Sequence, residues 1–164
     1  MELYILRHGI AEDGHTGLPD EKRQLTPEGR TKLREILKAA RRAGVSPSLI
    51  LTSPLVRAVQ TAEIAAEELS YSGELVRASS LVPDADHRET WSEIRTHRDD
   101  RQVLLASHNP LCASLAAYLL GARELWVDYK KGALMRVDFD RFGPEPHGVL
   151  RWFLVPKLVG DSTT

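Results

Sequence analysis

Four nitrogen-bearing side chains follow three separate apolar runs of the sequence: Arg7, His8, Arg57 and His108. An arginine stays protonated and holds a phosphoryl group through a planar fork of N–H donors. A neutral imidazole can attack phosphorus and carry the phosphoryl group as a phosphohistidine, which splits the transfer into two steps. Two arginines and two histidines in one crevice therefore favour a phosphoryl group, and a carboxylate ligand is the weaker alternative.

The two histidines are expected to have different roles. Gly9 follows His8, and a turn there would fix the backbone and leave nearby carbonyl groups to hold one ring nitrogen. The other ring nitrogen of His8 would then be the nucleophile. His108 would donate a proton to a phosphoryl oxygen, and its charged form would favour the extra negative charge of the transition state.

The elements that must position these residues are short apolar runs without helical spacing. Residues 3–6, 49–51 and 103–106 form three such runs, and each is typical of a strand buried inside a parallel sheet. Parallel strands end at the same edge of a sheet, where open α/β sheets bind their ligands. We therefore expect all four side chains to meet at that edge.

Helices are predicted after each of the three strands, and capping residues mark where they begin. Thr26 and Pro27 begin the first helix, which ends near Gly44. Ser53 is predicted to cap the second helix and Asn109 the third. Each cap leaves backbone N–H groups at a helix start, which is a favourable setting for an anion.

The whole pattern predicts a three-layer α/β/α fold with a mostly parallel central sheet. Residues 74–77 form a weaker strand candidate. Residues 135–139 and 149–155 carry the alternation of strands that close a mixed sheet as a hairpin. Residues 10–24 are polar and are expected to form an exposed loop beside the tip of the first strand.

Length and composition predict one globular domain, and the net charge does not favour nucleic acid or a membrane as its partner. With 164 residues, of which 42% are apolar, the chain can bury a core, and we expect a single domain over residues 1–159 and a disordered tail at 160–164. The net charge of −1 gives no global field for nucleic acid or an anionic membrane. No apolar run approaches the roughly 20 residues that span a bilayer.

The single cysteine indicates the cellular compartment, and the spacing of the cysteine and histidine residues indicates whether the protein binds a metal or cofactor. Cys112 stands alone, so no intrachain disulfide can form, and we expect a buried, inert thiol in a cytoplasmic protein. The first apolar run begins at position 3, so no signal peptide is expected. No His-Glu-x-x-His or paired Cys/His spacing occurs, so neither a metal nor a cofactor is expected.

Several blocks of the sequence resemble the signature of the histidine phosphatase superfamily, which has the phosphoglycerate-mutase-like fold. In chain order they are Arg7-His8-Gly9, Leu25-Thr26-Pro27-Glu28-Gly29, Thr52-Ser53-Pro54-Leu55-Val56-Arg57-Ala58-Val59-Gln60-Thr61-Ala62 and Ser107-His108-Asn109-Pro110. The resemblance covers residues 1–121 and implies a phosphate pocket of Arg7, Arg57 and His108, with His8 as the phosphorylated residue. The short length and Arg23-Gln24-Leu25-Thr26 are most similar to the small SixA-type phosphohistidine phosphatases.

One departure from the superfamily pattern bears on the substrate. Many mutases and phosphomonoesterases of the superfamily carry a glutamate general acid in a Leu-x-Glu segment, and the corresponding stretch here is Leu81-Val82-Pro83. An alkoxide leaving group needs a proton, and losing a general acid costs about 10²–10⁴-fold in rate. Imidazole leaves phosphorus more readily because its other nitrogen can be protonated near neutral pH. The carboxylates that could substitute from flexible loops are Asp84, Asp86, Glu12 and Asp13.

These features predict a metal-independent phosphatase that acts through phospho-His8, with phosphohistidine in a protein as the preferred substrate. Small phosphorylated metabolites are the second choice. The alternatives are a mutase of the same fold and a non-catalytic module that binds phosphorylated proteins. The four residues favour the enzyme, because a binding module does not need a nucleophile.

Other polar and aromatic residues have two interpretations each. Arg23 could be a third cation over the pocket or a solvated member of a charged run. Asn109 is expected to be a helix cap rather than a ligand contact, and Lys130-Lys131-Gly132 a turn rather than a rim. The three tryptophans, which are Trp91, Trp126 and Trp152, are expected to pack rather than to stack on bases.

Overall fold

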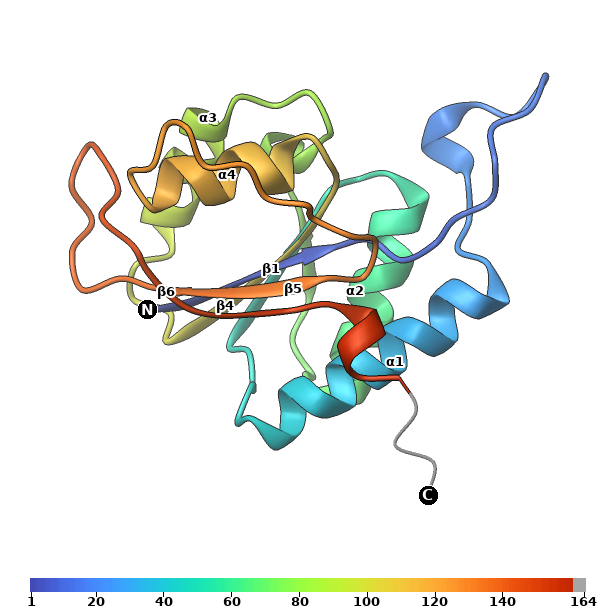
Figure 1. The fold of residues 1–164 in the computed structure, drawn as a ribbon, viewed down its shortest axis with the longest axis horizontal. Helices are drawn as coiled ribbons and strands as arrows, with labels where there is room; N and C mark the ends of the chain where they lie inside the picture. Colours follow the sequence, from blue (N-terminus) through green and yellow to red (C-terminus); the bar gives the residue numbers. More distant parts are fainter. Residues whose placement is uncertain (161–164) are drawn as a thin grey trace.

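A six-stranded mixed sheet forms the centre of the computed structural model, which describes residues 1–160 (Figure 1). The strands are β1 (Glu2–Arg7), β2 (Leu49–Thr52), β3 (Leu75–Arg77), β4 (Gln102–Ser107), β5 (Leu134–Asp138) and β6 (Val149–Leu154). The helices are α1 (Pro27–Arg42), α2 (Val56–Glu68), α3 (His87–Thr96) and α4 (Leu111–Leu119), with 3₁₀ turns η1 (Asp20–Lys22), η2 (Ser79–Leu81) and η3 (Pro156–Leu158).

The strand order is β3-β2-β4-β1-β5-β6. β1, β2, β3 and β4 run parallel to one another, whereas β5 pairs antiparallel with both β1 and β6. The mostly parallel sheet and its closing hairpin are therefore confirmed.

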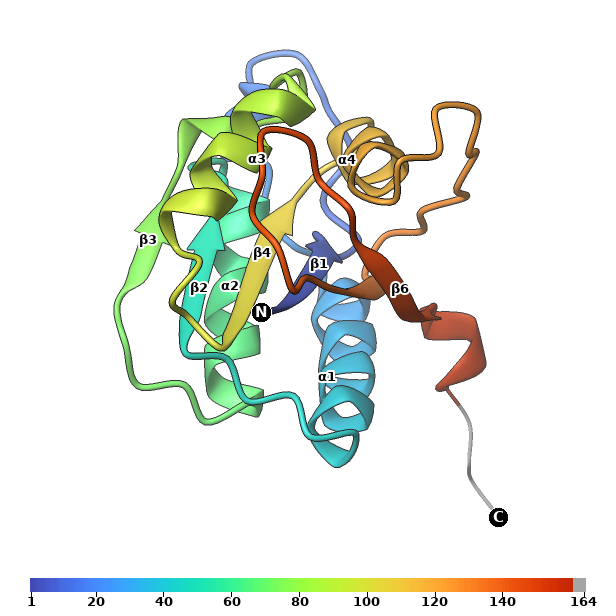
Figure 2. The same ribbon diagram turned by 90° about the vertical axis from the view of Figure 1, so that its left-hand side faces the viewer.

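Two helical layers cover the sheet, and the side-chain alternation of β1 shows why. Leu3 and Ile5 point to the face that packs against α3 and α4, and Tyr4 and Leu6 to the face covered by α1 and α2. All four side chains are fully buried. Figure 2 shows the helix pairs on opposite sides of the strands. The three-layer α/β/α fold is therefore confirmed.

The carboxyl ends of β1, β4 and β2 lie side by side in register. Arg7 pairs with Ser107, and Thr52 pairs with Ala106. Backbone hydrogen bonds continue past the pairs, because the N–H of His8 donates to the Ser107 carbonyl and that of Ser53 to the Ala106 carbonyl. The residue that follows each strand therefore starts at the same edge of the sheet.

The start of α1 is fixed against the chain that follows His8. The Thr26 hydroxyl accepts from the N–H of Gly29, as the capping pattern predicts, and the N–H of Thr26 donates to the Ile10 carbonyl. A Cβ at Gly29 would overlap the Ile10 backbone, so only glycine allows this close approach.

The two other predicted helix caps were wrong. α2 begins only at Val56 and has no side-chain cap. The Ser53 hydroxyl is hydrogen-bonded to His108 and also accepts from the N–H of Leu55, which lies before the helix. α4 begins after Pro110, and the Asn109 side-chain N–H donates to the carbonyl of Tyr129. Both side chains therefore make a tertiary contact.

The aromatic predictions hold in part. Trp91 is buried and packs against Phe139 at 5.0 Å between ring centroids, and Trp152 lies 5.9 Å from Tyr4. Trp126 was wrongly predicted to pack, since 94% of it is exposed.

Some predictions concern the extent of the chain. Residues 161–164 of the predicted tail lie outside the described residues, and the single domain over residues 1–159 stays a prediction. Across residues 1–160, none of the helices has the length and apolar character that crossing a bilayer requires.

Candidate active site

His8 is held as a neutral imidazole with a defined free nitrogen. The residue is 95% buried, and Nδ1 lies 2.7 Å from the Gly9 carbonyl oxygen. Burial, followed by the charges of Arg57, Arg7 and Lys131, lowers the pKa of His8 to about 3. A neutral ring whose Nδ1 faces a carbonyl carries its proton on Nδ1, so Nε2 keeps its lone pair.

His108 stands beside His8 and is also neutral. The two ring centroids are 5.1 Å apart, and the Nε2 atom of His108 lies 2.8 Å from the Ser53 hydroxyl. Burial, then the neighbouring His8 and Arg57, lower the pKa of His108 to about 3. An oxyanion next to this ring would raise its pKa, because a negative charge stabilises the protonated form.

The two predicted arginines flank the histidines. Arg7 Nη1 donates to the Tyr129 carbonyl at 2.6 Å, and Arg57 is 96% buried. Burial lowers the pKa of both guanidinium groups, but arginine remains protonated. Both positive charges act on both histidines, since each lowers the pKa of His8 and of His108. We call Arg7, His8, Arg57 and His108 the His–Arg cluster.

The His–Arg cluster has more buried donors than acceptors. Among residues 1–160, the buried nitrogen atoms without a hydrogen-bond partner include Arg7 Nε, Arg57 Nε and His108 Nδ1. Buried polar groups without partners are rare in folded proteins. The arrangement therefore favours an acceptor-rich anion, such as a phosphoryl group.

Three further residues hold the cluster in place, and their roles were missed in the sequence. The Thr61 hydroxyl donates to the Arg57 carbonyl at 2.7 Å and accepts from the N–H of Gly9, so it joins α2 to the turn after His8. Its position four residues after Arg57 puts it on the same helix face, which is a signal that could have identified it. Ser53 contacts His108, and Tyr129 contacts Arg7; no local pattern marks either.

The carboxylate closest to the cluster is Asp20 in η1, which was not among the predicted acids. Its Oδ2 lies 3.0 Å from Arg57 Nη2, and its backbone carbonyl accepts from Arg57 Nη1. Partial burial acts to raise its pKa, but hydrogen bonds from Arg23 and Arg57 outweigh this and lower it. Asp20 is therefore ionised near neutral pH.

Arg23 reaches the cluster through Asp20. Its Nε donates to Asp20 Oδ1 at 2.8 Å, and its Nη1 donates to the Glu12 carbonyl. Its charge also lowers the pKa of Arg57. Arg23 is therefore a cation near the cluster and a partner in a surface ion pair, and its role over the pocket stays a prediction.

The predicted substitute acids are used elsewhere or face solvent. The Glu12 carboxylate accepts from the N–H of Gln24, and Asp86 caps α3 by accepting from the N–H of Arg88. Asp13 and Asp84 are exposed. In the described part of the chain, none of the four forms a hydrogen bond or salt bridge with the His–Arg cluster.

The expectation of a buried, inert thiol concerns Cys112. Burial raises the pKa of the Cys112 thiol to about 12, which is the inert state that was expected. Over residues 1–160, no group of three or more His, Cys, Asp or Glu side chains is placed to hold a metal ion.

The described chain has clear relatives. Residues 3–79 match the Histidine phosphatase superfamily (branch 1). An uncharacterized protein of Picosynechococcus sp. is 36% identical over 111 residues, which are 67% of this chain and 67% of that protein. The phosphohistidine phosphatase SixA of Escherichia coli (strain K12) is 27% identical over 158 residues, 95% of this chain and 94% of SixA.

Solved structures extend the likeness to three dimensions. The protein histidine phosphatase SixA complexed with tungstate superposes with a TM-score of 0.86 at 26% identity, and the match covers 96% of this chain and 99% of that one. The similarity therefore extends far beyond residues 3–79.

Proposed function

Because this chain belongs to the histidine phosphatase superfamily, we propose that it removes the phosphoryl group from phosphohistidine in a protein, through a phospho-His8 intermediate. The chain is a metal-independent phosphatase, and its substrate is a phosphorylated compound. One observation supports the finer assignment. The Nδ1 of His8 is bound to the Gly9 carbonyl at 2.7 Å, which leaves a neutral Nε2 beside His108.

Each member of the His–Arg cluster has a proposed role. Arg7 and Arg57 bind the phosphoryl oxygens and offset their negative charge. His108 becomes protonated when the anion binds and donates to a phosphoryl oxygen, which favours the charge of the transition state. Arg23 adds a third positive charge, and its salt bridge to Asp20, at 2.8 Å, holds this charge near the cluster.

The proposed reaction has two displacements at phosphorus. In the first, the lone pair of His8 Nε2 forms a P–N bond while the P–N bond to the substrate imidazole breaks. The substrate ring is protonated on its other nitrogen, so it leaves as neutral imidazole. In the second, a water oxygen attacks the phosphoryl group, the His8 P–N bond breaks, and the water proton passes to the departing phosphate or to solvent.

The choice of phosphohistidine follows from what the leaving group needs. An alkoxide must be protonated as it leaves, whereas imidazole leaves without a general acid. Leu81 is fully buried where relatives with a general acid carry the Leu-x-Glu segment, and Val82 and Pro83 offer no proton. Small phosphomonoesters are the second candidate. The two arginines can bind their phosphoryl group in the same way, but the nearest carboxylate, Asp20, is ionised and offers no proton to an alkoxide.

The proposal extends to partners and place. A phosphorylated protein is the proposed partner, and neither nucleic acid nor a membrane is part of the reaction. We propose residues 1–159 as the domain that carries the activity. A cytoplasmic location is the proposal that the lone, buried Cys112 supports.

The covalent intermediate can be trapped directly. We expect the chain to take up label from a ³²P-phosphohistidine protein on rapid acid-free quenching, and His8→Ala to take up none. The matched control is His97→Ala at a partly exposed histidine paired with Glu93, which should label normally. Binding of the phosphoprotein without any label would instead support the non-catalytic module.

A substrate panel separates the candidate activities. The wild-type kcat/KM should be highest for phosphohistidine protein, lower for an aryl phosphate and lowest for sugar phosphates. Faster turnover of sugar phosphates would overturn the argument from the missing acid. Phosphoryl exchange between two sugar phosphates would identify a mutase.

A further inference from the structure

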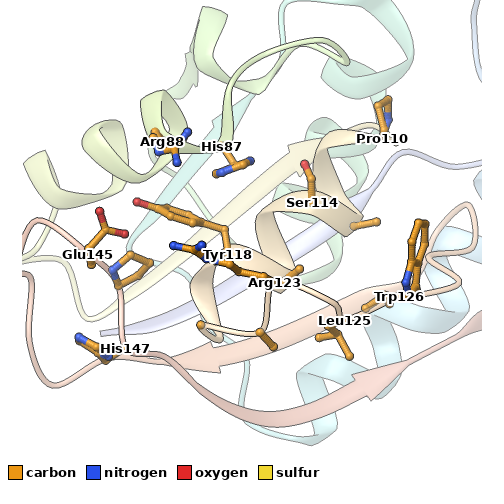
Figure 3. Close-up of a pocket in the computed structure, with 16 residues that line it drawn as sticks. His87, Arg88, Pro110, Ser114, Tyr118, Arg123, Leu125, Trp126, Glu145 and His147 are labelled. Atoms are coloured by element: carbon orange, nitrogen blue, oxygen red, sulfur yellow. The ribbon is translucent and has the colours of Figure 1, made fainter.

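A groove lies beside α4 and is not lined by the His–Arg cluster. Its volume is about 960 Å³. α4 and its flanking residues form the floor, the start of α3 forms one wall, and residues 121–127 and 145–147 form the others (Figure 3). Nothing in the proposed reaction uses this groove.

The floor of the groove is a straight helical surface of mostly small side chains. Ala113, Ser114 and Ala117 line it between Pro110 and Gly121, at the spacing of one helix face. The nine residues of α4 span about 13.5 Å, or about two and a half turns. Small side chains allow another backbone to approach closely, so the floor can accommodate a second helix of that length.

Two apolar side chains project at the rim of the groove. Trp126 is 94% exposed and Leu125 is 39% exposed. In Figure 3, Trp126 stands at the same end of the groove as Pro110, and Glu145 and His147 are at the other end. An exposed tryptophan next to a groove is a common anchor of protein–protein interfaces.

The lining has unneutralised positive charge. Arg88 and Arg123 both line the groove, and within residues 1–160 neither guanidinium takes part in a salt bridge. Glu145 is the one carboxylate among the lining residues, and it stands next to Tyr118. The groove therefore complements a negatively charged partner.

One end of the groove adjoins the His–Arg cluster. Pro110 lies two residues after His108, and Val127 lies two residues before Tyr129, whose carbonyl accepts from Arg7. The part of a bound partner that lies over Pro110 and Val127 would therefore be close to the His–Arg cluster. The floor is a helix whose backbone groups are hydrogen-bonded within α4, so a partner cannot bind there by adding a strand to a sheet. Recognition must therefore use side chains.

We propose that this groove docks an acidic amphipathic helix of the protein that carries the phosphohistidine, with its apolar face against Trp126 and Ala117 and its carboxylates facing Arg88 and Arg123. The inference rests on the proposed function and adds the surface that selects the protein. Phosphohistidine outside such a protein would lack this contact.

The test compares two substrates that share the same bond. One is a histidine-phosphorylated helical-bundle protein with an acidic face, and the other is the free amino acid phosphohistidine. For Trp126→Ala and for the double variant Arg88→Glu/Arg123→Glu, kcat/KM should fall about 10-fold or more with the protein, the scale of losing an interface anchor. The loss should appear in KM, and turnover of free phosphohistidine should not change.

The controls are exposed residues outside the groove. Leu158→Ala matches Trp126→Ala, because Leu158 is 75% exposed, and Arg141→Glu matches the charge reversals at an exposed site. Both should behave as wild type with both substrates. Equal losses with both substrates, or no loss with the protein, would overturn the docking proposal.

Two other outcomes are separable. If the wild type fails on both phosphohistidine substrates, the proposed function itself is wrong, and the docking inference falls with it. If the wild type is a dimer in sedimentation and Trp126→Ala is a monomer, the groove holds a second copy of this chain, which also overturns the proposal.

Discussion

At the scale of single residues, Asp20 sets how much positive charge Arg57 offers to an anion. Its carboxylate lies 3.0 Å from Arg57 and 2.8 Å from Arg23, so it offsets part of both charges. It also orients the Arg57 guanidinium through two contacts, one from its backbone carbonyl and one from its side chain. The two effects oppose each other when an oxyanion binds.

We predict that the electrostatic effect is the larger one. Asp20→Asn should tighten binding of inorganic phosphate by roughly 3- to 10-fold, since removing a negative charge a few ångströms away is worth on the order of 1 kcal/mol in a partly exposed site. Isothermal titration measures the change, and Asp13→Asn in the same loop is the control. Weaker binding by Asp20→Asn would mean that orienting Arg57 matters more.

At the scale of elements, the approach of α1 to the turn after His8 fixes the catalytic edge. Gly29 brings the first turn of α1 against the Ile10 backbone. The N–H and hydroxyl of Thr26 both donate to the Ile10 carbonyl. The position of His8 therefore depends on a helix that contributes no residue to the His–Arg cluster.

Gly29→Ala tests this dependence. Helix propensity alone would stabilise the chain by about 1 kcal/mol, but a Cβ here meets backbone that cannot easily move. We expect net destabilisation of about 1–3 kcal/mol, the usual range for overpacking, read from urea unfolding. We also expect weaker binding of inorganic phosphate.

The control for this substitution is Gly14→Ala, where a Cβ has nothing within 4 Å. It should leave stability and phosphate binding nearly unchanged. An increase in stability for Gly29→Ala would show that α1 can shift away from Ile10 at little cost.

At the scale of the whole molecule, burying two neutral histidines couples stability to pH. The pKa of His8 and of His108 is about 3 in the folded chain, against about 6.5 when unfolded. Below pH 6.5 the unfolded chain therefore binds protons that the folded chain does not. Stability from these groups is complete above pH 6.5 and falls as the pH drops towards 3.

Urea unfolding at pH 7, 6 and 5 measures this effect. Each histidine should contribute a loss of up to about 1.4 kcal/mol per pH unit over this interval. His8→Asn/His108→Asn should flatten the dependence, whereas His15→Asn, at an exposed histidine, should not. An unchanged slope in the double variant would show that the rings are protonated in the folded state.

The sequence by itself determined the elements and the edge at which they meet. The three buried strands were predicted from short apolar runs without helical spacing. Parallel pairing brings the ends of these strands together, so Arg7, His8 and His108 could be placed at one edge of the sheet from the sequence. The cap of the first helix was also predictable, because the Thr26 hydroxyl accepts from the N–H of Gly29, a near neighbour in the sequence.

Only the tertiary structure decided the contacts made by loops and by capping residues. Asp20 reaches Arg57 across 37 positions, and Ser53 reaches His108 across 55. Neither loop has a periodicity that would reveal its partner. Ser53 and Asn109 have strong local preferences as caps, but in the fold the Ser53 hydroxyl contacts His108 and the Asn109 side-chain N–H donates to the Tyr129 carbonyl. Such contacts depend on which distant groups the fold brings close, because buried polar groups pair with whatever partner packs against them.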